Sequence, residues 1–188
     1  MIKKIILIIF LTLIQKFAFA EIIYVSNEKD HNISVIDGNS LEVIKTVQVG
    51  HRPRGIILSK DKKKIIICTS DDNRITVVDV ASLEVEYYLP SGPDPELMVM
   101  DDDGKYIYVA NEDDNMVTVV DYLGKKVVKE IPVGVEPEGM GLSPDGKTLV
   151  NTSETTNMAH FIDTSTLEIK ANVLVDARPR VAQYTSDG

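Results

Sequence analysis

Charged residues on both sides of a repeated proline are the side chains of this sequence best placed to do chemistry. The pairs beside Pro53 and Pro179 are basic, and the pairs beside Pro95 and Pro137 are acidic. Two neighbouring guanidinium groups can hold a ligand carboxylate, whereas pairs of opposite sign can neutralise one another, which contributes about 0 to 1 kcal/mol at an exposed site. The sequence leaves both roles open for this candidate rim, which consists of Arg52, Arg54, Asp94, Glu96, Glu136, Glu138, Arg178 and Arg180.

Two further polar residues depart from the pattern of the repeat described below. Asn151 occupies a position that is apolar in the other copies, and His160 occupies one that carries serine or threonine. A buried polar side chain needs a hydrogen-bond partner, and histidine can also serve as a metal ligand, an axial ligand or an acid–base group. One histidine without cysteines or carboxylates at ligand spacing favours a hydrogen-bonded strand residue, so no catalytic, cofactor-binding or metal-binding residue is predicted.

Motifs typical of enzymes are missing from the sequence. It has no Gly-x-Ser-x-Gly nucleophile elbow, no phosphate loop and no zinc motif. The acidic runs at 71–72, 101–103 and 113–114 invite a calcium site, but they lack EF-hand spacing and fall at turn positions that favour aspartate. These observations favour a protein that is not an enzyme.

A 42-residue repeat must position the rim. Asp37, Asp79, Asp121 and Asp163 are 42 residues apart and each ends a similar apolar run, and the four prolines follow the same spacing. Each copy contains short runs rich in β-branched and aromatic residues, separated by turn sequences such as the one at 143–146. Four short strands per repeat of this length predict an all-β fold, a β-propeller of four-stranded blades. The predicted units are 22–64, 65–106, 107–148 and 149–188.

The phase of the repeat predicts how the chain enters and leaves the propeller. Residue 22 begins what should be the second strand of a blade, and the run after each proline should be the innermost strand of the next blade. The first blade then lacks its inner strand, and residues 186–188 form a turn inside a fifth blade. We therefore expect an N-terminal part of a longer propeller, cut off before the ring closes. The rim loops, which join outer to inner strands, should share one face near the central channel.

The first 20 residues are typical of a cleavable signal peptide. A short basic start precedes an apolar run of about ten residues, too short to span a bilayer, and Ala18-Phe19-Ala20 matches a cleavage site. This predicts cleavage after Ala20, export, and no membrane insertion afterwards. The chain carries 29 acidic against 20 basic side chains, which argues against nucleic acid as a partner. The one cysteine, Cys68, lies in an apolar run and is expected to be buried and inert.

Several segments carry a family resemblance. Residues 24–27 and 108–111 resemble the Tyr-Val-Thr-Asn motif of bacterial YVTN-type β-propeller repeats. The longer segments 49–55, 91–96 and 151–161 resemble periplasmic propellers associated with pyrroloquinoline-quinone-dependent alcohol catabolism. The resemblance implies a periplasmic protein with about seven blades. It also implies a link to a dehydrogenase or transporter component, with the quinone entering only by association.

Two function hypotheses follow. The first is a non-catalytic periplasmic binding or accessory protein that serves a quinone-dependent alcohol oxidation system. The alternative is a propeller enzyme such as a lactonase-like hydrolase. Propeller lactonases and heme d1 domains share this architecture, and a fold alone does not determine a function.

Overall fold

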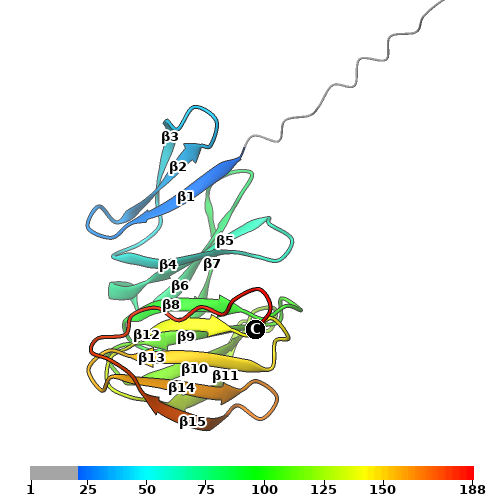
Figure 1. The fold of residues 1–188 in the computed structure, drawn as a ribbon. Coiled ribbons are helices and arrows are strands. Elements are labelled where there is room, and N and C mark those ends of the chain that lie inside the picture. Colours follow the sequence, from blue (N-terminus) through cyan, green and yellow to red (C-terminus); the bar gives the residue numbers. More distant parts are fainter. Residues whose placement is uncertain (1–20) are drawn as a thin grey trace, which may run out of the picture.

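The computed structural model describes residues 21–188, and the predicted signal peptide at 1–20 lies outside the described residues. The described chain is built from antiparallel sheets that follow one another along the sequence (Figure 1). The first sheet contains β1 (Ile22–Asn27), β2 (Asn32–Asp37) and β3 (Val43–Gln48). The second contains β4 (Pro53–Leu58), β5 (Lys64–Thr69), β6 (Arg74–Asp79) and β7 (Val85–Pro90), with a 3-10 turn at Ser70–Asp72.

The last two sheets repeat this plan. The third contains β8 (Pro95–Met100), β9 (Tyr106–Asn111), β10 (Met116–Asp121) and β11 (Lys126–Pro132). The fourth contains β12 (Pro137–Leu142), β13 (Thr148–Ser153), β14 (Met158–Asp163) and β15 (Glu168–Leu174). We call the four sheets the first to fourth blades. The all-β propeller prediction is confirmed.

The apolar runs form strands because neighbouring blades cover both of their faces. Ile66 and Val77 of the second blade pack against Met98 and Ile107 of the third in one continuous core. The central strands are therefore buried on both sides, which explains why β5 is a nearly unbroken run of apolar residues. No helix among residues 21–188 is long and apolar enough to cross a bilayer.

The strand order shows the phase of the repeat in the described residues. The first blade has three strands, and each later blade begins with an inner strand directly after the rim loop. Neighbouring inner strands approach closely, since a Cβ atom on Gly55 would lie 2.6 Å from the carbonyl oxygen of Glu96. The C-terminal segment lies beside β12 in the same way (Figure 1), with Val181 C 3.0 Å from the Cβ position of Gly139. Residues 179–184 therefore occupy the place of the next inner strand.

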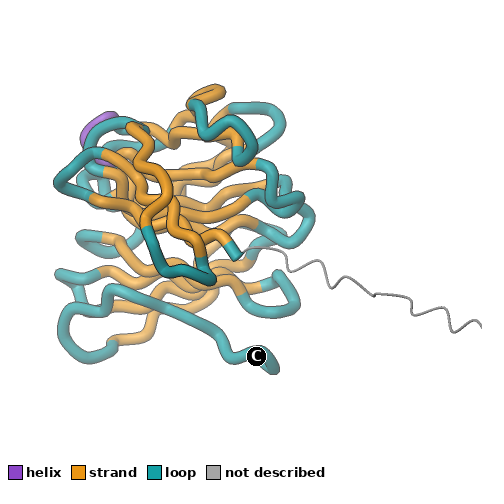
Figure 2. Tube along the Cα trace, turned by 90° about the horizontal axis from the view of Figure 1, so that it is seen from above, coloured by secondary structure: helices purple, strands orange, loops and turns teal. Residues whose placement is uncertain are grey.

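The loops divide between the two ends of the strands (Figure 2). One end carries the loops between inner and second strands, such as the turn at 143–146. The other end carries the rim loops and the loops that follow β1, β5, β9 and β13. Rim residues far apart in the sequence thus share one face.

Candidate functional site

The rim loops share an unusual backbone that one hydrogen bond per blade supports. Each loop places a residue with positive φ directly before its proline, a conformation that is uncommon for residues other than glycine and is further restricted before proline. These residues are Arg52, Asp94, Glu136 and Arg178, with φ between 48° and 60°. The N–H of each donates to a side chain 21 residues earlier, and the acceptors are His31, Asn73, Asn115 and Asn157.

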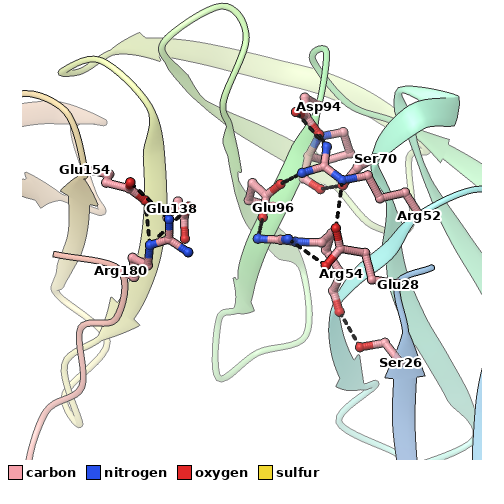
Figure 3. A network of polar contacts seen from close by, with 12 residues as sticks. Ser26, Glu28, Arg52, Arg54, Ser70, Asp94, Glu96, Glu138, Glu154 and Arg180 are labelled. Atoms are coloured by element: carbon pink, nitrogen blue, oxygen red, sulfur yellow. Dashed lines mark hydrogen bonds and ion pairs between the residues drawn. The ribbon is translucent and has the colours of Figure 1, made fainter. Parts of the chain in front are cut away.

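The basic loop of the second blade connects three blades through ion pairs (Figure 3). The Arg52 guanidinium donates to both carboxylate oxygens of Asp94, at 2.7 and 2.9 Å, and its Nη2 donates to Glu96 at 3.3 Å. In the opposite direction, Arg52 Nε and Arg54 Nη1 donate to Glu28 at 3.2 and 3.0 Å. Arg54 also contacts the second carboxylate oxygen of Glu96. Both arginines are therefore engaged by carboxylates of the first and third blades.

The C-terminal pair of arginines is engaged in the same manner. Arg180 donates to both oxygens of Glu154, at 2.7 and 3.0 Å, and Arg178 contacts the same carboxylate. Arg180 Nε lies 3.9 Å from Glu138. Of the two roles that the sequence leaves open for the rim, the structure shows neighbour-to-neighbour pairing of its arginines.

Sequence reasoning missed the carboxylates that complete this network. Glu28, Glu112 and Glu154 follow the second strands of the first, third and fourth blades, and Ser70 occupies the equivalent position of the second. They are spaced by multiples of 42 residues, so the repeat that located the prolines could also have located them.

Two rim carboxylates are buried where ionisation is unfavourable. Glu96 is fully buried, and this burial raises its pKa to about 8, with Arg54 acting in the opposite direction and Asp94 and Glu112 adding to the rise. Glu138 is 6% exposed, and burial raises its pKa as well, while Arg180 lowers it.

An acidic sector remains without cations on the same face. We give this name to Glu112, Asp113 and Glu136, for which the described residues provide no ion-pair partner. Glu136 accepts a hydrogen bond from the Thr155 hydroxyl. One carboxylate oxygen each from Asp94, Glu96 and Glu112 lies within 4.8 Å of the others. Hard cations favour such oxygens, but the guanidinium groups of the second blade already contact two of these three residues.

His160 and Asn151 lie inside the fourth blade and not on the rim surface. His160 Nε2 accepts from the Gly134 N–H at 2.9 Å and lies 3.1 Å from Ser153 Oγ, and Nδ1 lies 2.7 Å from the side-chain oxygen of Asn172. Asn151 donates to the Gly139 carbonyl oxygen at 3.1 Å. The structure brings neither of them to the charged groups of the rim.

The loops beside the rim differ between the second and third blades. Asp72 accepts from the N–H of His51 at 2.9 Å and from its ring Nδ1 at 2.8 Å. Although burial alone would raise the pKa of Asp72, the hydrogen bonds from His51 hold it below its usual value. Asp114 is the equivalent residue of the third blade, but Pro93 replaces the histidine and has no N–H to donate. Asp114 Oδ1 is buried without a donor, and burial raises the pKa of this carboxyl group.

Comparison with known families explains the architecture. The sequence profile of the cytochrome D1 heme domain matches residues 67–184, well over half of the chain. The chain belongs to the cytochrome D1 heme domain family. A chain of Kuenenia stuttgartiensis hydrazine synthase has a similar fold, with a TM-score of 0.76 and 24% sequence identity. The match covers 82% of this chain and 46% of that one, so this chain spans about half of its length. At this identity the likeness shows the fold alone, and no curated protein matches the chain.

The family name implies heme, and neither the cysteine and His160 nor the charged rim fits it. Proteins hold heme iron through histidine, cysteine, methionine or tyrosine. Cys68 is fully buried in the core between the second and third blades, and both ring nitrogens of His160 contact hydrogen-bonding partners. The rim surface is lined by charged residues, whereas the apolar faces of a porphyrin favour apolar walls.

Proposed function

We propose that this cytochrome D1-type propeller is a non-catalytic binding or accessory module, and that its acidic sector is the contact surface for a basic partner. The charge balance of the rim carries the proposal. The rim arginines are engaged by carboxylates of neighbouring blades, whereas Glu112, Asp113 and Glu136 have no ion-pair partner among the described residues. A ligand carboxylate would have to displace an existing ion pair, while a cationic patch would meet unpaired charge.

The environment of the buried serine and histidine favours binding over hydrolysis. Ser153 Oγ lies 3.1 Å from His160 Nε2, a distance suited to a nucleophile and its base. Both residues are buried within the fourth blade, at 0% and 5% exposure. This hydroxyl is thus out of reach of a substrate, which supports a structural role for the pair.

The partner that we propose is a periplasmic component of a quinone-dependent alcohol oxidation system, either the dehydrogenase or a transporter component. The resemblance of residues 49–55, 91–96 and 151–161 to propellers of such systems supports this choice, and the leader-like residues 1–20 support export to the periplasm. Pyrroloquinoline quinone would belong to the partner.

A binding measurement with charge reversal tests the proposal. The full chain is immobilised and titrated with a purified pyrroloquinoline-quinone-dependent alcohol dehydrogenase from the periplasm, using wild type and the double variant Glu112→Lys/Glu136→Lys. We expect the double variant to bind about tenfold or more weakly, because reversed rim charges slow association and change its salt dependence. The matched control is the double variant Glu84→Lys/Glu168→Lys, an equal charge change at two exposed positions away from the rim, which should bind like wild type.

Two results would overturn the proposal. Equal affinity for wild type and the double variant would remove the acidic sector from the interface. Lactone hydrolysis by the wild type, lost in Glu138→Gln, would make the protein the hydrolase of the alternative hypothesis. The N-terminal sequence of the protein recovered from the periplasm checks export separately, and it should begin at Glu21.

A further inference from the structure

We infer that the described blades of this heme-domain family member supply no histidine ligand to heme, because their histidines serve the scaffold and the charged rim. The sequence has three histidines, His31, His51 and His160. The internal repeat allows each to be compared with the equivalent residue of the other blades. Such a comparison separates a histidine with a structural role, which other blades fill with another residue type, from one that could ligate iron.

His31 performs a task that asparagine performs elsewhere. Its Nδ1 accepts the N–H of Arg52 at 3.0 Å. In the other blades, the equivalent backbone N–H donates to the side-chain oxygen of an asparagine 21 positions earlier. These acceptors are Asn73, Asn115 and Asn157, at 3.0, 3.2 and 3.1 Å. A neutral imidazole that accepts at Nδ1 carries its proton on Nε2. His31 therefore has no free lone pair for iron while it supports the rim loop.

His160 performs a task that serine and threonine perform elsewhere. Every blade links the end of its second strand to the start of its third through one polar side-chain pair. These pairs are Asn27 with Ser34, Thr69 with Thr76, Asn111 with Thr118, and Ser153 with His160, at 2.8, 3.1, 2.6 and 3.1 Å. His160 adds a bond from the Gly134 N–H, so its ring also holds the fourth blade's rim loop.

His51 is the histidine that comes nearest to a ligand. Asp72 contacts its Nδ1, an arrangement that often orients a metal-binding imidazole, and Nε2 is then free to accept. However, its side chain is 66% exposed, and the side chains around it are the polar groups of Asp72 and His31.

The apolar hollow of the second blade lies at the wrong end for a heme on His51. It is lined by Ile22, Ile56 and Leu58, among others. Ile22 begins β1 and Leu58 ends β4, whereas the loop after β1 and the rim loop before β4 lie at the other end of these strands. A heme held by His51 would thus place its macrocycle against charged rim residues and water, without the apolar walls that bury a porphyrin.

A spectroscopic titration tests this inference. The full chain is titrated with hemin while the Soret band is recorded, together with His31→Asn, His51→Ala and His160→Thr. The first and last of these substitutions introduce the residue of other blades. His31→Asn should leave the thermal unfolding temperature close to that of wild type, whereas His160→Thr also removes the bond from the Gly134 N–H and should lower it. We expect no saturable shift to a histidine-ligated Soret band, or, if the protein does hold heme, the same spectrum in all three variants.

A ligand among these histidines would give a different result. It would produce a one-to-one Soret shift that one variant loses although it remains folded, and that added imidazole restores. If a variant proved unstable, an iron–histidine stretch in the resonance Raman spectrum of the wild-type complex would identify a histidine ligand without it. Either result would overturn the inference.

Discussion

The rim loops of the second and third blades carry side chains of opposite charge on the same backbone conformation. The second blade presents Arg52 and Arg54, both of which are engaged by carboxylates of the blades on either side. The third blade presents Asp94, Glu96 and Glu112, whose carboxylate oxygens gather within 4.8 Å. The loops nevertheless have the same positive φ before proline and the same hydrogen bond from their N–H.

This difference separates the residues that fix the loop backbone from the charged side chains, which can vary between blades. The backbone conformation of the loop depends on the asparagine or histidine acceptor and on the proline, which both blades have. The charged side chains affect ion pairing and ionisation instead. Within residues 21–188, the second blade pairs both of its rim arginines, whereas the third blade has a buried carboxylate, Glu96, and one without an ion-pair partner, Glu112. The predictions below test this contrast, beginning with the largest effect.

Removal of Arg54 should have the largest effect on stability. In Arg54→Met, the fully buried Glu96 loses a guanidinium contact, and breaking a buried ion pair costs about 3 kcal/mol or more. The loss should be largest near pH 9, where Glu96 is ionised, and smaller near pH 6, where a proton neutralises it. Denaturant unfolding at the two pH values measures this difference.

Glu138→Gln, at the equivalent position of the fourth blade, should lower the free energy of unfolding far less, because Glu138 has a single cation at 3.9 Å. Equal losses in both variants would contradict the contrast.

The pH dependence of stability should reflect Glu96. Its pKa is raised in the folded protein to about 8, so the folded state binds more protons than the unfolded state between the ordinary value near 4.5 and 8. The free energy of unfolding should therefore fall as the pH rises through this window, by at most about 1.4 kcal/mol per pH unit for this one group. Glu96→Gln should flatten the slope, and an unchanged slope would show that another group titrates. Glu28→Gln is the control, since the pKa of Glu28 is lowered and not raised.

Asp72 and Asp114 should respond to the same substitution with opposite signs. Asp72→Asn weakens the charge-assisted bonds from His51 and should lower the free energy of unfolding by about 1 kcal/mol. Asp114→Asn removes a negative charge that burial, Glu130 and Asp113 already disfavour, so stability should stay the same or rise. Thermal unfolding of the two variants measures both changes. A comparable loss in Asp114→Asn would mean that its carboxylate has a cation in solution.

The smallest effect concerns two equivalent glutamates in different surroundings. Glu28→Gln removes a partner of Arg52 and Arg54 and should destabilise the protein by about 0.5 kcal/mol. Glu112→Gln relieves repulsion from Asp94 and Glu96 and should stabilise it by a similar amount, about 0.5 kcal/mol. Both changes, measured by denaturant unfolding, should shrink at high salt, which screens exposed charges. The same sign for the two variants would refute the contrast at this position.

Much of the candidate site could be located from the sequence. The prolines at 42-residue spacing identified the rim loops and their shared face, because β-strands of fixed length in identical blades bring equivalent loops to one end. The same spacing contained Glu28 and Glu112, which were overlooked since they lie in different loops from the prolines. The task of His31 was hidden as well, because histidine replaces asparagine there and the two residue types look unrelated in a sequence.

The sequence by itself determined the blade, its phase and the residues that reach the rim. These properties depend on local patterns: alternating and continuous apolar runs, turn residues, and a period that the chain repeats without a gap. Only the tertiary structure decided which charges meet. Arg52 contacts residues 24 positions before it and 42 positions after it, because adjacent blades pack face to face and bring their rims within reach of one guanidinium group. The burial of Glu96 and the lack of an ion-pair partner for Glu112 among the described residues have the same origin, since both depend on neighbouring blades and not on residues adjacent in the sequence.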